Sequence, residues 1–266
     1  MVLGYLKRGA YTSLLYGASS GLVRIASFFC LPFFLHALTL QEFGLWDFYQ
    51  LFFSLGTLLI SSSTATAMTR YYLLYKDEQE KQRQSVGNAF LTAVVAALLC
   101  LVIGIVSVWS HVHIYTILTL LNISLFSLFA VFLAYLRVRE FLWLYMACVV
   151  GQSLLALLLT LVGVWYGYGL VSFFYANGVS YLLFLPCFVY VWMRYSTYDR
   201  VLGKQQLIYS FPLLLNSLVF MGFFSLDRMV ITATAGYETL GLYALLWRFG
   251  SVFQFCAIAL YDAWVL

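Results

Sequence analysis

Apolar residues run through this chain in long stretches, and short polar breaks separate them. About eight stretches of roughly 20 residues or more are long enough to cross ~30 Å of hydrocarbon as helices. We place them at about 11–36, 43–69, 87–110, 113–136, 141–163, 169–193, 206–235 and 240–262. The pattern predicts an all-α, polytopic membrane bundle of about eight transmembrane helices.

The basic residues alternate in step with these stretches. Of the fourteen Lys and Arg residues, eleven lie at the ends or in the connections of one side. The opposite connections contain none of them: 37–42, 111–112, 164–168 and 236–239. Cytoplasmic connections carry the excess of Lys and Arg, so both the N-terminus and the end at Leu266 are predicted to be cytoplasmic. The net charge of +4 is spread through these connections, so no nucleic-acid surface is predicted.

Three arginines remain inside the apolar stretches: Arg24, Arg228 and Arg248. An arginine at mid-bilayer costs ~2.5 to 3.5 kcal/mol on insertion scales and therefore faces a bundle interior or a wet cavity. Counted with Asp47 and Asp227, the interior charge is +1. Such a cavity favours an anion, and arginine suits phosphate through bidentate hydrogen bonds.

Polar residues form a stripe on each of the first two stretches, at helical spacings of three and four. The stripe residues are Ser13, Gly17, Ser20, Arg24 and Ser27, then Asp47, Gln50, Ser54, Thr57, Ser61 and Thr64. We interpret Arg24, Asp47 and Gln50 as the border of a hydrated cavity. Three alternatives stay open. The hydroxyls could only support close helix packing; Asp47 could be an interfacial charge; Asp227 could pair with Arg248 or Arg228 and only lock helices together.

No catalytic or metal site is predicted. The five cysteines all lie within apolar stretches and form no CxxC pair, and His111 and His113 flank a turn. A membrane-embedded transferase would need clustered His, Asp or Glu near one surface, which the sequence lacks. We therefore predict no enzyme and no cofactor. Asp47 and Asp227 are the candidates for coupling transport to protons or sodium.

The chain also contains a short internal repeat. The segment Glu42-Phe43-Gly44-Leu45-Trp46 resembles Thr239-Leu240-Gly241-Leu242-Tyr243 at an offset of 197 residues. That offset is close to the length of six spans, as two lobes of parallel orientation would produce. We therefore predict a six-helix lobe over residues 1–200 and the first two helices of a second, incomplete lobe over 201–266.

These motifs carry a family resemblance. The Leu-Thr-x-x-Glu-Phe-Gly-Leu-Trp turn (38–46) and Ser-Leu-Asp-Arg-Met-Val-Ile (225–231), followed by Gly-Leu-Tyr (241–243), resemble polysaccharide-exporter flippases of the multidrug/oligosaccharidyl-lipid/polysaccharide superfamily. The resemblance implies a two-lobed transporter of twelve to fourteen helices in the bacterial cytoplasmic (inner) membrane. Such proteins turn a lipid-linked oligosaccharide from the inner to the outer leaflet by alternating access. Their cationic central cavity implies a substrate-binding role for Arg24, Arg228, Arg248 and Gln50.

The resemblance also implies partners, namely a lipid-linked oligosaccharide, membrane lipid, and glycan polymerases or glycosyltransferases. Because about eight spans replace twelve to fourteen, the chain is expected to be a truncated member. The alternatives are a multidrug-type cation extruder of the same architecture, for which acidic residues should dominate the cavity, and a non-functional fragment.

Overall fold

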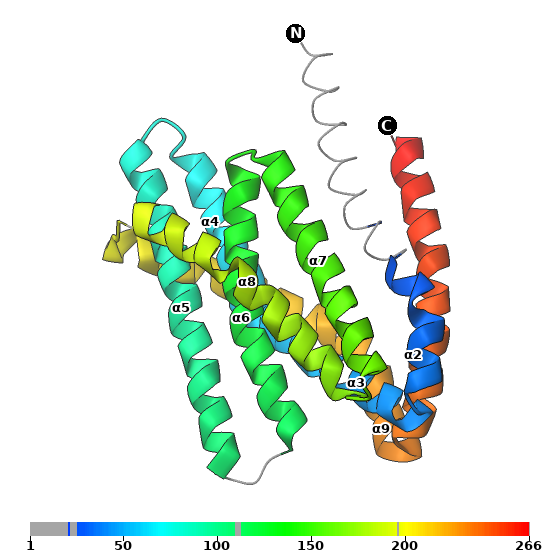
Figure 1. The fold of residues 1–266 in the computed structure, drawn as a ribbon. Coiled ribbons are helices and arrows are strands. Elements are labelled where there is room, and N and C mark those ends of the chain that lie inside the picture. The colour runs from blue at the N-terminus through cyan, green and yellow to red at the C-terminus, as the bar shows by residue number, and fades with distance from the viewer. Residues whose placement is uncertain (1–20, 22–25, 110–112, 196, 266) are drawn as a thin grey trace.

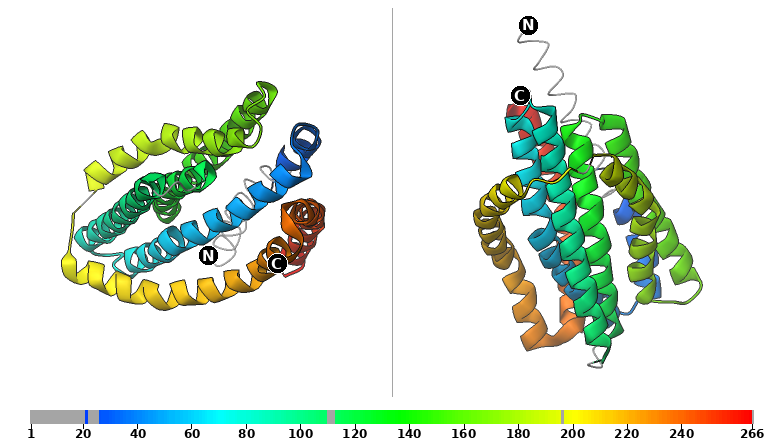
Figure 2. Two further views of the ribbon diagram at one scale, coloured as in Figure 1. Left: turned by 90° about the horizontal axis from the view of Figure 1, so that it is seen from below. Right: turned by 90° about the vertical axis from the view of Figure 1, so that its left-hand side faces the viewer.

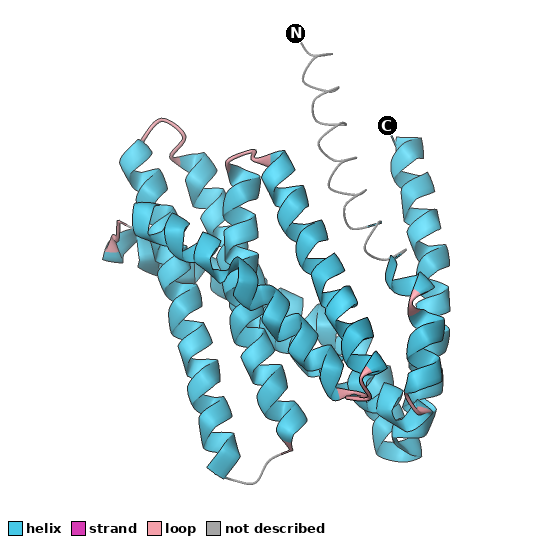
Figure 3. Ribbon diagram, in the orientation of Figure 1, coloured by secondary structure: helices cyan, strands magenta, loops and turns pink. Residues whose placement is uncertain are grey.

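Helices account for nearly all of the secondary structure, and the described residues contain no strand (Figure 3). The computed structural model describes residues 21, 26–109, 113–195 and 197–265. The elements in chain order are α2 (Leu31–Ala37), α3 (Leu40–Thr57), the π-helical turn η1 (Leu58–Ser62), α4 (Ser63–Leu74), α5 (Gln79–Trp109), α6 (Ile114–Val138), α7 (Leu142–Trp165), α8 (Val171–Tyr195) and α9 (Arg200–Val265).

Seven helical segments within the described residues are long and apolar enough to cross a membrane. They are Leu40–Leu74, Gln79–Ser107, Ile114–Val138, Leu142–Trp165, Val171–Arg194, Arg200–Phe223 and Ser225–Gly250, and a shorter apolar helix covers Ala26–Ala37. The prediction of an all-α, multi-pass membrane bundle is confirmed. Most of the first predicted span, 11–36, lies outside the described residues.

Helices α3 and α4 are continuous through η1 and occupy the middle of the molecule. They pack against α6 and α5 on one side and against α9 on the other (Figures 1 and 2). Helices α7 and α8 cover the far side of α6. A large core cluster lies among α4, α5, α6 and α8, where Phe90 stacks on Phe188 at a centroid distance of 4.7 Å.

Helix α3 begins at Leu40, three residues before its apolar stretch, because a capping box fixes the start of the helix there. The Thr39 hydroxyl accepts a hydrogen bond from the Glu42 N–H, while the Glu42 carboxylate accepts one from the Thr39 N–H. This pair satisfies two backbone donors that a helix start leaves unpaired. The Leu-Thr-x-x-Glu motif is therefore a helix start, and it places Asp47 two turns inside α3.

Helix α9 consists of two arms that meet at Gly236. Its φ of 80° and ψ of 179° interrupt the helix, which then continues to Val265. A positive φ of this kind is readily adopted only by glycine. We call residues 200–235 the first arm of α9 and residues 237–265 the second arm. The first arm is fastened to α5 by Gln206, whose side-chain amide donates to the Ser85 hydroxyl at 2.7 Å.

The second arm crosses α3 with the two backbones in direct contact. A Cβ added to Gly44 would meet the carbonyl oxygen of Tyr237 and approach the nitrogen of Gly241 to 2.8 Å. A Cβ added to Gly241 would meet the carbonyl oxygen of Leu40 and approach the nitrogen of Gly44 to 3.2 Å. Positions 40 and 237 share the 197-residue offset of 44 and 241. The contact is therefore reciprocal, as between two units related by a twofold axis.

Candidate functional site

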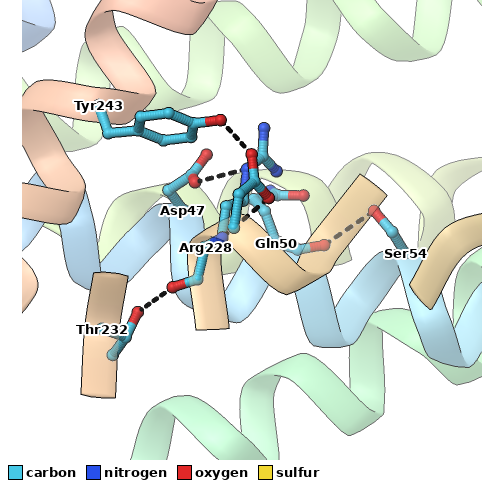
Figure 4. Close-up of polar contacts among 7 residues, drawn as sticks. Asp47, Gln50, Ser54, Arg228, Thr232 and Tyr243 are labelled. Carbon is cyan, nitrogen blue, oxygen red and sulfur yellow. Dashed lines mark hydrogen bonds and ion pairs between the residues drawn. The ribbon is translucent and has the colours of Figure 1, made fainter. Parts of the chain in front are cut away.

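An ion pair inside the apolar bundle joins α3 to the first arm of α9. The Arg228 Nε lies 3.4 Å from the Asp47 Oδ2, and the two side chains are 21% and 10% exposed (Figure 4). Asp47 Oδ2 is buried and has no hydrogen-bond partner within the described part of the chain. The ion pair with Arg228 is therefore the main interaction that offsets the cost of burying this charge. The alternative of Asp47 as a plain interfacial charge would leave the carboxylate exposed, whereas the structure buries it between α3 and α9.

Arg228 also lines a cavity of about 570 Å³ between η1 and the two arms of α9. We call it the arginine cavity; its walls include Leu58, Asn216, Ser217, Phe220, Arg228 and Trp247. The Trp247 ring lies 5.8 Å from the Arg228 guanidinium. Within the described residues, the Nη atoms of Arg228 make no hydrogen bond or ion pair, since its one carboxylate contact is through Nε. Both Nη groups are thus available to an anion in the cavity.

Arg248 has different surroundings. Its guanidinium lies 4.1 Å from the centre of the Trp46 ring and 4.8 Å from that of Phe43. It is also within electrostatic range of Asp47. Because cation–π contacts of this kind stabilise a desolvated arginine, Arg248 holds the second arm of α9 against α3. It was predicted to bind substrate together with Arg228; the structure brings it to the same carboxylate but stacks it on these rings.

Asp227 joins the two arms of α9. Its carboxylate accepts a hydrogen bond from the Tyr243 hydroxyl and, at 2.8 Å, one from the backbone N–H of Arg228. The alternative in which Asp227 pairs with the side chain of Arg228 is not what the structure shows, because the ion pair of Arg228 is with Asp47. The sequence did not predict Tyr243 as the partner of Asp227. Tyr243 does occur in the internal repeat, where it corresponds to Trp46.

The hydroxyl residues of the second stripe, which runs along α3, η1 and α4, donate hydrogen bonds to backbone carbonyls one turn earlier in the same continuous helix. Ser54 donates to the carbonyl oxygen of Gln50 at 2.8 Å, Thr57 to that of Ser54 at 3.0 Å, and Thr64 to that of Ile60 at 2.8 Å. Such back-bonding satisfies a hydroxyl without a ligand. These hydroxyls therefore fit the alternative that they only support helix packing. Of the stripe, only Asp47 and Gln50 remain in the candidate site.

Gln50 lies one turn beyond Asp47 but lines a second cavity. This cavity of about 140 Å³ lies among α3, α6 and α8, and we call it the amide cavity. Its walls include Trp46, Gln50, Thr119, Asn122, Phe173 and Asn177. Gln50 had been grouped with the arginines, whereas the structure places it with two asparagines that sequence reasoning did not single out.

Arg24 and His111 lie outside the described residues. Among those described, no group of three or more His, Cys, Asp or Glu residues could hold a metal ion. Four of the five cysteines have side chains that the structure describes, and these are free thiols: Cys30, Cys100, Cys148 and Cys187.

Comparison with protein-family models, with curated proteins and with solved structures finds no match for this chain. The fold and the site therefore carry the assignment. Seven apolar spans are present, two of their helices share a buried ion pair, and Arg228 lines an open cavity beside that pair. This multi-pass membrane architecture fits a membrane transporter in general.

Proposed function

We propose that this protein is a transporter that turns lipid-linked pyrophosphate oligosaccharides from the inner to the outer leaflet by alternating access, for polysaccharide biosynthesis. The arginine cavity is the observation that carries the proposal. It offers the Nη atoms of a partly exposed arginine inside an otherwise neutral cavity. Two parallel N–H donors of a guanidinium match the oxygens of a phosphate.

The rest of the cavity wall suits a head group that remains attached to a lipid. Phe220, Met221 and Trp247 are apolar or aromatic, while Asn216, Ser217 and Ser225 supply uncharged hydrogen-bonding groups. Binding sites that orient a ligand commonly combine an apolar wall with a few polar groups in this way. In this proposal the phosphate occupies Arg228 and the apolar wall lies along the first isoprenoid or acyl carbons.

Asp47 is the proposed coupling residue. It competes with a substrate phosphate for Arg228, because both are anions that bind the same guanidinium. A proton or a sodium ion on Asp47 weakens its pair with Arg228 and thereby favours substrate binding. Asp227, which bonds Tyr243 across the two arms, is the second candidate. Glycan polymerases or glycosyltransferases are the proposed protein partners.

A multidrug-type cation extruder is the alternative. It needs an acidic cavity, whereas Arg228 is the one charged residue among the described residues that line this cavity. A cationic drug would therefore meet a like charge.

Flux measurements test the proposal. Proteoliposomes that contain the full chain would be given a fluorescent lipid-pyrophosphate oligosaccharide in one leaflet. Arg228→Gln should reduce flux about tenfold or more, because a hydrogen bond to a charged group contributes ~1.5–3 kcal/mol. Arg228→Lys should be intermediate, since an ammonium keeps the charge but loses the bidentate fork. Arg24→Ala tests the residue that the sequence predicts and the structure does not describe.

Arg137→Gln is the matched control. Arg137 lies at the opposite end of the bundle, where it donates to the Tyr145 hydroxyl at 3.0 Å. It should retain flux. Undiminished flux in Arg228→Gln would refute the proposal, and drug efflux without lipid flux would favour the cation extruder.

A further inference from the structure

The amide cavity contains a buried acceptor with no partner. The side chain of Asn122 is deeply buried, with the residue 3% exposed. Its amide nitrogen donates to the carbonyl oxygens of Leu118 at 2.8 Å and Phe174 at 3.1 Å, which uses both donors and fixes the orientation of the amide. Its Oδ1 has no hydrogen-bond partner within the described residues. Buried polar atoms are nearly always paired, so an unpaired one indicates an additional ligand.

Two further polar residues of this cavity bond to backbone carbonyls of their own helices. Thr119 donates its hydroxyl proton to the Tyr115 carbonyl at 2.7 Å, and Asn177 donates from its amide to the Phe173 carbonyl at 2.8 Å. Their donors are directed to helix backbones, and their oxygens keep lone pairs. The cavity therefore offers the acceptor oxygens of Asn122, Thr119 and Asn177 beside the Gln50 amide, which can also donate, and the matching ligand carries O–H groups that donate and accept.

Charge and shape narrow the ligand further. The described residues that line the cavity include no charged side chain. The Trp46 ring forms part of the cavity wall, and the Arg248 guanidinium packs on this ring, 4.1 Å from its centre. A positive charge so close disfavours a cation as the occupant. Trp46 and Phe173, with ring centroids 5.0 Å apart, supply an aromatic surface for the C–H face of a ring.

The volume of the cavity suits one ring and not a chain of several. Its 140 Å³ is several times the ~30 Å³ that one water occupies in the liquid. Helix α3 with η1 borders both cavities, since Trp46 and Gln50 line the amide cavity and Leu58 lines the arginine cavity. The two cavities lie on different sides of this helix, the amide cavity towards α6 and α8 and the arginine cavity towards α9.

We propose that the amide cavity is a subsite for one uncharged, hydroxyl-bearing sugar ring of the transported head group. The proposal rests on the proposed function. The hydroxyls of the ring donate to Asn122 Oδ1 and to Thr119 Oγ1, and its apolar face lies against Trp46.

Binding of simple sugars to the full chain in lipid nanodiscs tests this subsite. The probes are a panel of neutral methyl hexosides and methyl N-acetylhexosaminides, measured by saturation-transfer NMR. Thr119→Val should raise the Kd of the hexoside that binds about 3- to 10-fold, as expected for one neutral hydrogen bond. Valine keeps the shape of threonine, and the lost bond lies within one helix, so the variant should fold.

Thr160→Val is the matched control. Thr160 is 4% exposed and donates to the Ala156 carbonyl at 2.7 Å, whereas Thr119 is 3% exposed and donates to Tyr115 at the same distance. Thr160 lies on α7 and is absent from the cavity wall. This variant should bind the hexoside as the unmodified chain does.

Gly178→Ala provides a second test that removes no hydrogen bond. The added Cβ would lie 3.5 Å from Asn122 Oδ1, an ordinary contact that crowds the acceptor without a clash. Alanine is also favoured over glycine inside a helix. Weaker hexoside binding by this variant is the expected result.

Two results would overturn the subsite: no hexoside binds, or Thr119→Val and Gly178→Ala bind it unchanged. Binding of inorganic pyrophosphate, followed by isothermal titration calorimetry, separates this failure from failure of the proposed function. Pyrophosphate binding that Arg228→Gln abolishes, in samples without hexoside binding, removes the subsite alone. Absence of pyrophosphate binding that depends on Arg228 removes the proposed function itself.

Discussion

The guanidinium of Arg228 is bonded through one nitrogen, and the rest of it faces a cavity. Asp47 contacts Nε, and the Trp247 ring lies 5.8 Å away. Arg248 is instead stacked on two rings of α3. Two arginines that look alike in the sequence therefore differ in role: Arg228 is open to a ligand, while Arg248 stabilises a helix contact.

A double-mutant cycle measures the pair between Asp47 and Arg228. Asp47→Asn should destabilise the protein by up to ~3–5 kcal/mol, the cost of removing one partner of a buried ion pair. The loss of stability should lie toward the lower end of this range, because the Arg228 side chain is 21% exposed and therefore partly solvated. Adding Arg228→Gln should recover part of the loss, because the unpaired charge is gone. The free energy of unfolding, followed by denaturant titration in mixed micelles, gives the coupling.

The exposed pair of Lys81 and Glu78 is the control. Its atoms are 2.8 Å apart, but the side chains are 45% and 53% exposed. Glu78→Gln should change the stability by ~0–1 kcal/mol. Equal losses for Asp47→Asn and Glu78→Gln would show that the interior pair is as solvated as the surface pair.

The crossing of α3 with the second arm of α9 depends on two glycines. Gly44→Ala and Gly241→Ala each place a methyl group against a backbone carbonyl that cannot rotate away. Overpacking typically costs ~1–3 kcal/mol, and here it should outweigh the ~0.5–1 kcal/mol that alanine contributes to a helix. Thermal unfolding of each variant in detergent checks this expectation.

Gly104→Ala is the comparison for this element. Its Cβ would meet the Leu120 side chain at 3.8 Å, an ordinary contact, so the variant should be neutral or slightly more stable. A Gly44→Ala protein as stable as Gly104→Ala would mean that the helices cross at a greater separation.

The sequence predicted the elements better than the site. Apolar stretches located the spans from α3 to α8, although α5 begins at Gln79 instead of 87 because a polar helical segment precedes its apolar part. In α9, the predicted spans 206–235 and 240–262 differ from the observed Arg200–Phe223 and Ser225–Gly250. The repeat found the two glycines that meet, but nothing in it showed that they would face each other. The pairing of Asp47 with Arg228 depends on the rotation of α9 about its axis, which spacing does not define. Asn122 and Asn177 lie on different helices, and no local pattern connects them.

At the scale of the whole molecule, the connections alternate between two ends. The turns after α4 and α6 lie at one end, and the turn of α9 at Gly236 lies at the other (Figure 1). The first of these ends carries Lys76, Arg137 and Arg139. Which end faces the cytoplasm stays a prediction that rests on the positive-inside rule.

Cysteine labelling tests this sidedness. In a chain whose five native cysteines are replaced, Glu238→Cys should react with a membrane-impermeant maleimide on intact cells. Lys76→Cys should react after permeabilisation only. Both positions lie next to connections, so the substitutions should leave the fold intact. Labelling of position 76 on intact cells would invert the topology.

The close crossing at Gly44 and Gly241 limits how α3 and the second arm of α9 can move against each other. The residues next to the two glycines, Phe43 and Leu240, are fully buried, so the helices are closely packed where they cross. A change in the angle between the helices would leave the two glycines in contact and would displace the ends of the helices farther than the residues at the crossing.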